Sequence, residues 1–130
     1  GAVTTLAGDG TAGMEDATGK QARFNQPCDV AVASDGTVYV ADRGNRRIRF
    51  VSPDGAVRTL AGSGEKAWRD GVGATAAVHD PLSLHLKEAE GLLIVATGHS
   101  GHRLRTITVA NGKQRAESKY PVFPIIRTKL

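Results

Sequence analysis

The stretch Pro27–Gly62, PCDVAVASDGTVYVADRGNRRIRFVSPDGAVRTLAG, decides the fold of this chain. It holds four short apolar or alternating runs, and turn-forming residues separate each run from the next. Asp35-Gly36 and Pro53-Asp54-Gly55 are hairpin signals between such runs. The spacing predicts a four-stranded antiparallel meander over residues 29–61. One such meander cannot bury both of its faces alone, so we expect it to pack against neighbouring structure.

Composition supports an all-β class. The chain has 130 residues, which suits one modest domain, and its 16 glycines with few aromatics favour many tight turns over long helices. The single cysteine, Cys28, excludes an intrachain disulfide and is expected to be a small buried residue rather than a reactive thiol. No run approaches the roughly 18 apolar residues that a membrane span needs, and no motif indicates a compartment.

The net charge of +4 is concentrated at one end of the sequence. Residues 1–110 carry 12 Lys/Arg and 12 Asp/Glu, whereas residues 111–130 carry five Lys/Arg and one Glu. A nucleic-acid surface is expected to show a basic patch on the folded domain itself. A basic tail is a weaker signal for such a partner.

An internal repeat extends the meander in both directions. Residues 3–27 match residues 57–81 at an offset of 54, with ten identities in 25 positions, several of them glycines at turns. Beyond Pro81 the register drifts by one to three residues, but the pattern of strands and turns continues. The repeat predicts that one structural unit recurs along the chain.

The repeat divides the chain into a folded segment, residues 1–112, and a divergent basic tail, residues 113–130. The second unit is the more degenerate copy, and its last strand is expected directly after Gly112. Two prolines in residues 120–126 suit only an edge strand or extended chain. Along the chain we expect a strand at 3–7, a Gly-rich loop at 8–26, a unit at 29–61, a second loop at 62–80 and a second, degenerate unit at 82–118, whose end overlaps the tail.

These residues resemble the NHL-repeat family of β-propellers. The resemblance rests on Asn25-Gln26-Pro27, on residues 35–42 (DGTVYVAD), on residues 44–49 (GNRRIR) and on residues 57–62 (VRTLAG). In the family, His usually follows the Asn of the loop, and Arg46 takes that place here. The second unit departs further, since Thr97 stands where the first unit has Asp42, and Gly101-His102 where it has Asn45-Arg46.

The resemblance implies a partial β-propeller of four-stranded antiparallel blades, with two blades and one strand of a third. Propellers need about four to eight blades to close, so two blades leave apolar faces that invite association. Three explanations stay open: a fragment of a longer chain, self-assembly of several copies, and a truncated gene product. The start at Gly1, in mid-pattern, favours the fragment.

In such a propeller, the loops between blades share one face with the loops between second and third strands. That implication brings together residues 8–26, 62–80, 42–45 and 97–101, and any binding site is expected there. The alternative is that these residues only hold turns, with Asp42 and Asn45 bonded to the backbone and Trp68 anchoring its loop. The candidate binding residues are Asp42, Arg43, Asn45, Arg46, Trp68, Arg69, His79 and His99.

Motifs for catalysis or metal binding are weak. The chain has four histidines, but none shows a metal-ligand spacing, and we expect neither a metal nor a cofactor. His85 lies in an apolar strand and is expected to be a core residue. Four arginines recur at period two on one strand face, and they either pair with loop acids or form a phosphate-contacting stripe: Arg47, Arg49, Arg103 and Arg105.

Three functions follow from these features. The first is a non-catalytic module that presents loops to a protein or peptide partner. The second is RNA binding, which the resemblance to some NHL propellers implies, although only Trp68 and Tyr39 could stack bases and Tyr39 is expected in the core. The third is an enzyme of lyase or lactonase type, which some similar propellers are. The sequence favours the first function, with no enzymatic activity and no membrane partner.

Overall fold

The computed structural model describes residues 1–98 and 101–109 and the backbone of residues 125–129. These residues form antiparallel β-sheets, and the described helices are four 3-10 turns of three residues each. The expected all-β class is therefore confirmed. Within the same residues, no helix has the length and apolar character that a membrane span requires.

The first sheet is a meander with the strand order β1-β2-β3-β4. Both predicted hairpin turns place a glycine at positive φ, 91° at Gly36 and 90° at Gly55, a conformation that glycine adopts without steric cost. The meander predicted over residues 29–61 is confirmed. Its strands are β1 (Pro27–Val32), β2 (Val38–Asp42), β3 (Arg47–Val51) and β4 (Val57–Ala61).

The second sheet has five strands in the order β6-β11-β10-β9-β8. Strands β8, β9 and β10 repeat the antiparallel pairing of β1, β2 and β3. A separate two-stranded ribbon joins β5 (Trp68–Arg69) to β7 (Ala77–Val78). The strands of the second sheet are β6 (Gly71–Val72), β8 (Pro81–Lys87), β9 (Leu92–Thr97), β10 (Leu104–Thr108) and β11 (Ile125–Lys129).

The strand of the second sheet that corresponds to β4 lies further along the chain than we expected. The strand that pairs with β10 in this position is β11, at residues 125–129, so the sheet takes a strand from the stretch interpreted as a divergent tail. In β11, Thr128 lies opposite Arg105, just as Thr59 of β4 lies opposite Arg49. Residues 113–124 lie outside the described part of the chain.

Residues 3–7 form no strand, which corrects a second expectation. Their sequence matches that of β4, but β4 pairs with β3, and no described strand lies beside residues 3–7. Val3 and Leu6 are consequently 97% and 52% exposed. Strand-forming sequence alone is not enough, because a single strand leaves its backbone groups without partners.

The two Gly-rich connections repeat each other in detail. In each, an amide hydrogen-bonds across the loop: Gly8 N–H to Gly19 O at 3.0 Å, and Gly62 N–H to Gly73 O at 3.1 Å. In both loops a 3-10 turn begins at the glycine that accepts this bond, η1 (Gly19–Gln21) and η3 (Gly73–Thr75). Residues that are 54 positions apart in the sequence therefore occupy equivalent places in the two loops.

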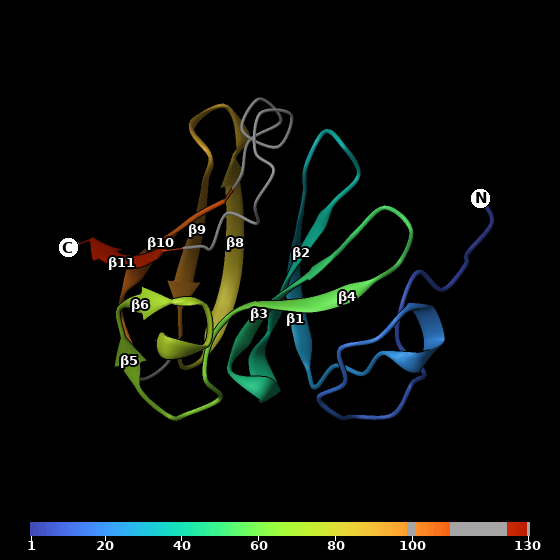
Figure 1. Ribbon diagram of the computed structural model, residues 1–130, viewed down its shortest axis with the longest axis horizontal. Coiled ribbons are helices and arrows are strands. Elements are labelled where there is room, and N and C mark those ends of the chain that lie inside the picture. Colours follow the sequence, from blue (N-terminus) through green and yellow to red (C-terminus); the bar gives the residue numbers. More distant parts are fainter. Residues whose placement is uncertain (99–100, 110–124, 130) are drawn as a thin grey trace.

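The two sheets pack with strands β1 and β8 side by side (Figure 1). Asp29 of β1 accepts a hydrogen bond from Leu84 N–H of β8 at 2.7 Å. Most of the core lies between the sheets, and a smaller cluster lies between the first sheet and residues 7–24. The main cluster comprises Ala33, Tyr39, Ala41, Ile48, Ala61, Ala76, Val78, Leu84, Leu93, Val95, Ile107 and Val109.

Two predictions of burial on the inner strands were wrong. Cys28 of β1 and His85 of β8 are both exposed. Cys28 Sγ nevertheless lies 3.2 Å from Pro81 O, and desolvation raises the pKa of the thiol above its ordinary value. His85 lies opposite Ile94, on the face of β8 that turns away from the main core. Tyr39, by contrast, is in the core as expected.

Candidate functional site

The connecting loops gather at one end of the sheets, as the resemblance implied. The turn η2 (Arg43–Asn45) between β2 and β3 lies at the lower edge of Figure 1, with loops 8–26 and 62–80 on either side. Gly44 N–H donates to Asn25 O at 2.8 Å, and Gly98 N–H donates to Asp80 O at 2.9 Å. We call this end of the molecule the loop face.

Asp42 is the buried centre of the loop face in the first sheet. It ends β2, and its side chain has no solvent exposure. One carboxylate oxygen accepts from Asn25 N–H at 2.8 Å, and the other accepts from Asn45 Nδ2 at 2.7 Å and from Arg49 Nη1 at 2.7 Å. Asn45 Nδ2 also donates to Gly13 O at 2.8 Å. Asp42 and Asn45 therefore hold the turn and the loop together.

Arg49 carries the positive charge that this carboxylate balances. The side chain is fully buried and donates to Asp42, to Asp16 at 2.8 Å and to the carbonyl oxygens of Glu15 and Arg23. In the second sheet Arg105, also fully buried, donates to Asp70 at 2.9 Å. The predicted pairing of these two arginines with loop acids is confirmed.

Arg43 joins the two sheets. Its Nε lies 2.6 Å from Asp80 Oδ1, an aspartate of the loop that precedes β8. The hydrogen bond to Asp80 raises the pKa of the Arg43 guanidinium. The aspartate is nearly buried, whereas the side chain of Arg43 is 39% exposed, so part of the guanidinium faces solvent.

Arg46 and Arg47 clamp the second loop through carbonyl oxygens. Arg46 has a left-handed backbone, φ 53°, and its Nη1 donates to Gly64 O at 3.2 Å. Arg47 donates to Asn45 O at 2.9 Å and to Ser63 O at 3.0 Å. Neither guanidinium forms an ion pair with any carboxylate among the described residues. Their charge is therefore not balanced locally.

Trp68 is packed as a loop anchor. It pairs with Val78 in the β5–β7 ribbon, and its ring meets the His79 ring edge-on with centroids 5.2 Å apart. The guanidinium of Arg103 lies 5.0 Å from the ring centroid, and a Cβ at Gly101 would lie only 2.7 Å from Trp68 Nε1. The interpretation as an anchor fits this environment better than that of a free binding aromatic.

His79 lies in a positive environment. Burial is the largest cause that lowers the pKa of its imidazole, and the nearby charges of Arg46, Lys66 and Arg43 lower the pKa further, although Asp80 opposes them. Its Nδ1 is buried without a hydrogen-bond partner among the described residues. The imidazole is therefore neutral at pH 7.

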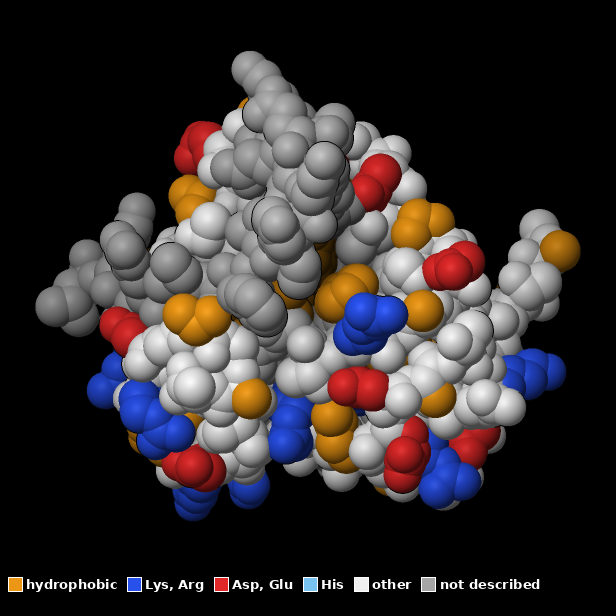
Figure 2. Space-filling model, viewed as in Figure 1, with side chains coloured by type: hydrophobic (Ala, Val, Ile, Leu, Met, Phe, Trp, Pro, Cys, Tyr) orange, Lys and Arg blue, Asp and Glu red, His pale blue; other side chains and the backbone are white. Residues whose placement is uncertain are grey.

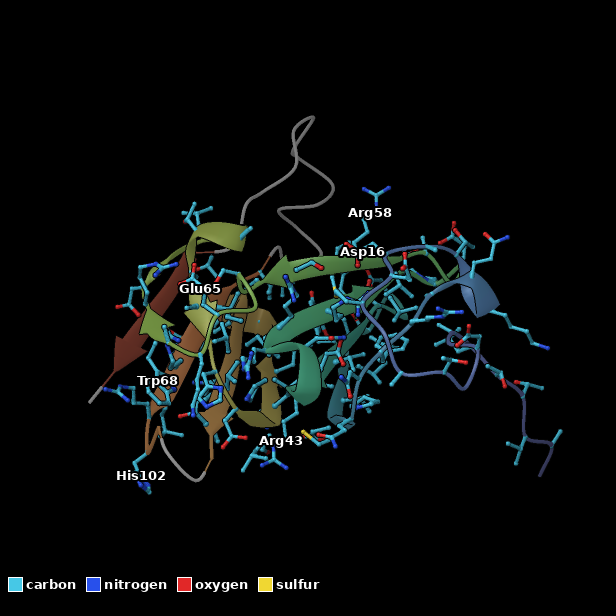
Figure 3. All side chains as sticks on the ribbon, turned by 90° about the horizontal axis from the view of Figure 1, so that it is seen from below. Asp16, Arg43, Arg58, Glu65, Trp68 and His102 are labelled. Atoms are coloured by element: carbon cyan, nitrogen blue, oxygen red, sulfur yellow. The ribbon has the colours of Figure 1, made fainter. Side chains whose placement is uncertain are left out.

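The remaining candidates are less connected to this cluster. Arg69 is exposed, and it pairs with Glu65 at 3.1 Å and donates to Thr75 O at 3.0 Å. His99 lies outside the described residues. His102 is exposed with a left-handed backbone, φ 45°, and points away from the body of the protein in Figure 3.

Three cations that were not among the predicted site residues lie beside the candidates that the structure brings together: Arg47, Lys66 and Arg103. Lys66 is exposed beside Trp68 in the sequence, and Arg103 stacks on the Trp68 ring. Arg47 and Arg103 were already visible as repeated strand arginines, but no pattern in the sequence showed that they reach this surface. We define the cationic loop surface as Arg43, Arg46, Arg47, Lys66 and Arg103. Figure 3 looks onto this end of the molecule.

An open hollow of about 710 Å³ lies at the other side of the loop face, between the first residues and loop 8–26. Thr5, Asp9, Lys20 and Phe24 are among its lining residues. It is separate from the cationic loop surface, because no residue of that surface lines it. Among the described residues, no group of three or more His, Cys, Asp or Glu side chains is placed to hold a metal ion.

Comparison with known proteins identifies the first repeat. Residues 10–52 match the family model of the teneurin NHL domain. The chain is also 51% identical over 37 residues to human and mouse Teneurin-4. This part of the chain belongs to the NHL-repeat family. The matched repeat contains Asp16, Asp42 and Arg49, so the buried ion-pair network lies wholly inside it.

A second relative matches a longer stretch. The chain is 32% identical over 89 residues to the Arabidopsis thaliana protein SUPPRESSOR OF QUENCHING 1, chloroplastic, which is 68% of this chain. The chain spans only 8% of the length of that relative and 1% of Teneurin-4. The similarity therefore concerns a small part of each of these proteins.

A solved structure shares the fold. It is described as a "Putative phosphatase" from Bacteroides thetaiotaomicron VPI-5482, and it matches 97% of this chain with a TM-score of 0.64. The sequence identity is 22%, and the match covers 26% of the other chain. The arrangement of the two sheets thus recurs inside a longer protein.

Proposed function

We propose that this chain is a protein- or peptide-interaction module without catalytic activity. In this proposal the two sheets are neighbouring blades of an NHL β-propeller, within a longer chain, and the loop face receives the partner. The match of the chain to 26% of a longer structure and its small share of both relatives support this placement.

The observation that carries the proposal is how the loop face uses its polar groups. Its buried carboxylate, Asp42, accepts hydrogen bonds from Asn25, Asn45 and Arg49, all of which hold loops in place. Several cations of the loop face, such as Arg46 and Lys66, have no carboxylate partner among the described residues. A rigid loop framework with charged side chains displayed on it suits recognition of a partner.

RNA binding receives less support from the geometry. Single-stranded RNA is bound by stacking its bases on open aromatic faces beside Arg or Lys. Trp68 is the aromatic side chain on this surface, and Arg103 and His79 already contact its ring. Tyr39, the other aromatic considered, is only 2% exposed.

A selection from a random peptide library displayed on phage tests the proposal. We expect the immobilised chain to enrich peptides that lose binding when Lys66 is changed to Glu but keep it when Arg58 is changed to Glu. Arg58 is an exposed arginine on β4, and Figure 3 shows it on the side of the molecule away from Arg43. If no peptide is enriched, or if both variants lose binding equally, the loop face is not the interaction surface.

A further inference from the structure

The cationic loop surface holds more positive than negative charge in the described part of the chain. Arg43 pairs with Asp80, and the neighbouring Glu65 pairs with Arg69. Arg46, Arg47 and Arg103 instead donate to carbonyl oxygens, and Lys66 forms no ion pair with any described residue. Residues 1–110 as a whole carry equal numbers of cations and anions, so this excess is local.

The surface draws its cations from both sheets and from the loop between them. Arg43 and Arg46 belong to the β2–β3 turn and Arg47 begins β3. Lys66 belongs to loop 62–80, and Arg103 precedes β10. Contacts connect these elements, since Arg46 reaches Gly64 in the loop and Arg103 stacks on Trp68. Figure 2 shows Lys and Arg side chains along the lower edge of the molecule, where this end lies, with acidic groups interspersed.

Two arginines of the surface, Arg47 and Arg103, are held in place by contacts within the protein. Arg47 donates to two carbonyl oxygens, and Arg103 donates to Gly101 O at 2.8 Å while its guanidinium stacks on Trp68. A side chain that is already ordered loses little conformational entropy on binding. Guanidinium groups also pair with carboxylates through two parallel hydrogen bonds, which adds specificity.

The His79 imidazole lies close to three of these cations and to Asp80. Arg46, Lys66 and Arg43 all act to lower the pKa of its side chain, although they belong to two different loops. Their fields therefore overlap at one place on the protein. An anionic group bound there would interact with several cations at once.

Resting on the proposed function, we infer that the cationic loop surface binds an acidic peptide segment of a partner protein, with Lys66 and Arg46 as central contacts. Carboxylates suit this surface better than RNA, because charge is present without an open aromatic face for bases. An extended peptide rich in Glu or Asp can follow the cations from the β2–β3 turn of the first sheet across to Arg103 of the second.

Fluorescence anisotropy with labelled peptides tests this inference. The probe is a short peptide of alternating Glu and Ser, and its matched control carries Gln in place of each Glu. We expect the Glu peptide to bind at low salt and the Gln peptide to bind at least about tenfold more weakly, with the difference shrinking as salt is raised.

Two variants of the protein locate the binding. Lys66→Glu should weaken binding of the Glu peptide about tenfold, whereas Arg58→Glu, the same change of sign for an exposed cation on β4, should leave it within about twofold. Arg46→Gln, which keeps a polar side chain at a left-handed position, should weaken binding by a smaller factor. Unchanged urea unfolding curves show that each variant is folded.

Three results would overturn the inference. They are equal binding of the Glu and Gln peptides, equal loss in Lys66→Glu and Arg58→Glu, and tighter binding of single-stranded poly(U) RNA than of the Glu peptide. If the phage selection enriches neutral peptides that still depend on Lys66, the interaction function stands while the acidic specificity fails.

Discussion

The two sheets balance the charge of a buried arginine in different ways. Each buries one arginine on its third repeat strand, Arg49 or Arg105, beneath a Gly-rich loop. The first sheet neutralises Arg49 with the buried Asp42 and the exposed Asp16. The second has Thr97 in the position of Asp42, so Arg105 relies on carbonyl oxygens and on Asp70, and its Nε lacks a partner among the described residues.

The difference shows which part of the unit tolerates change. Both sheets retain the arginine and the loop aspartate, which hold the connection against the sheet. The buried carboxylate at the end of the second strand is dispensable when backbone carbonyl oxygens surround the guanidinium. The following predictions test this comparison, beginning with the largest expected effect.

Asp42→Ala should destabilise the protein most. The substitution leaves Arg49 buried with Asp16 as its one carboxylate partner, removes the acceptor of Asn25 N–H and leaves Asn45 Nδ2 bonded to Gly13 O alone. Removing one member of a buried ion pair costs about 3–5 kcal/mol of unfolding free energy. Urea unfolding followed by circular dichroism measures the loss.

The matched variant is Thr97→Ala in the second sheet. Thr97 Oγ1 exchanges hydrogen bonds with the backbone of Arg103 and neutralises no charge, so the cost should be about 1 kcal/mol. Equal losses in the two variants would show that Asp42 does not balance a buried charge.

Gly62→Ala should cost more than Gly8→Ala, although the two glycines occupy equivalent loop positions. Both have positive φ, 111° and 100°, so each alanine pays about 1–3 kcal/mol for its backbone conformation. A Cβ at residue 62 would also lie 2.6 Å from Arg46 O, whereas at residue 8 the nearest atom is Phe24 Cδ2 at 3.6 Å. We expect a difference of at least about 1 kcal/mol in unfolding free energy.

The comparison of Gly62 with Gly8 also tests how firmly the second loop is held. If both variants lose the same stability, Arg46 and Arg47 do not clamp loop 62–80 against the first sheet. A larger loss for Gly8→Ala would reverse the interpretation of which loop is more tightly packed.

Thr97→Asp should stabilise the second sheet by about 1 kcal/mol, because a carboxylate there would face Arg105 as Asp42 faces Arg49. The gain is modest, since Thr97 Oγ1 gives up its hydrogen bonds to Arg103. Thr97→Asn is the uncharged control and should not stabilise. A loss of stability in Thr97→Asp would mean that carbonyl oxygens already saturate Arg105.

The smallest effect should be a dependence of stability on pH at His79. Its pKa is lower in the folded protein than in the unfolded chain, so the unfolded chain binds more protons as the pH falls through about 6.5. Unfolding free energy should therefore decrease from neutral pH down to the folded-state pKa and then level off.

His79→Asn tests this, because Asn25 is the equivalent residue before the first sheet. The variant should flatten the dependence of the urea midpoint between about pH 7.5 and pH 5.5. An unchanged slope in the variant would assign the dependence to another titrating group.

Much of the fold could be predicted from the sequence, because its signals are local. Asp35-Gly36 and Gly55 indicated two turns of the first sheet, and the recurrence of Arg49 and Arg105 on equivalent strands predicted their pairing with loop acids, without showing which acids these are. The residues of β11 were harder to place, since Arg127-Thr128 repeats Arg58-Thr59 at a much greater distance from the preceding strand.

The errors share a physical cause. Alternation along a strand shows which residues share a face but not whether another element covers that face. Cys28 was assigned to the core from its place at the start of a strand and His85 from its apolar strand, and both residues are exposed. Residues 3–7 have the sequence of a strand, yet pairing requires a neighbour that local sequence cannot supply.

The candidate site was only partly visible for a related reason. Residue type and turn position suggested Asp42 and Asn45 as turn-holding residues, and the structure gives them that role. The cationic loop surface depends on contacts between distant segments, such as Arg46 with Gly64 and Arg43 with Asp80. No spacing in the sequence encodes those contacts.

The position of β11 also bears on how the chain folds. Five residues separate β3 from β4, but 16 separate β10 from β11. The longer connection adds roughly 1 kcal/mol of entropy cost to closing the second sheet. Residues 71–72 of β6 must then meet residues 125–126, more than 50 positions away. Contacts this distant in sequence slow folding, so the first sheet is the natural nucleus and the second is completed on it.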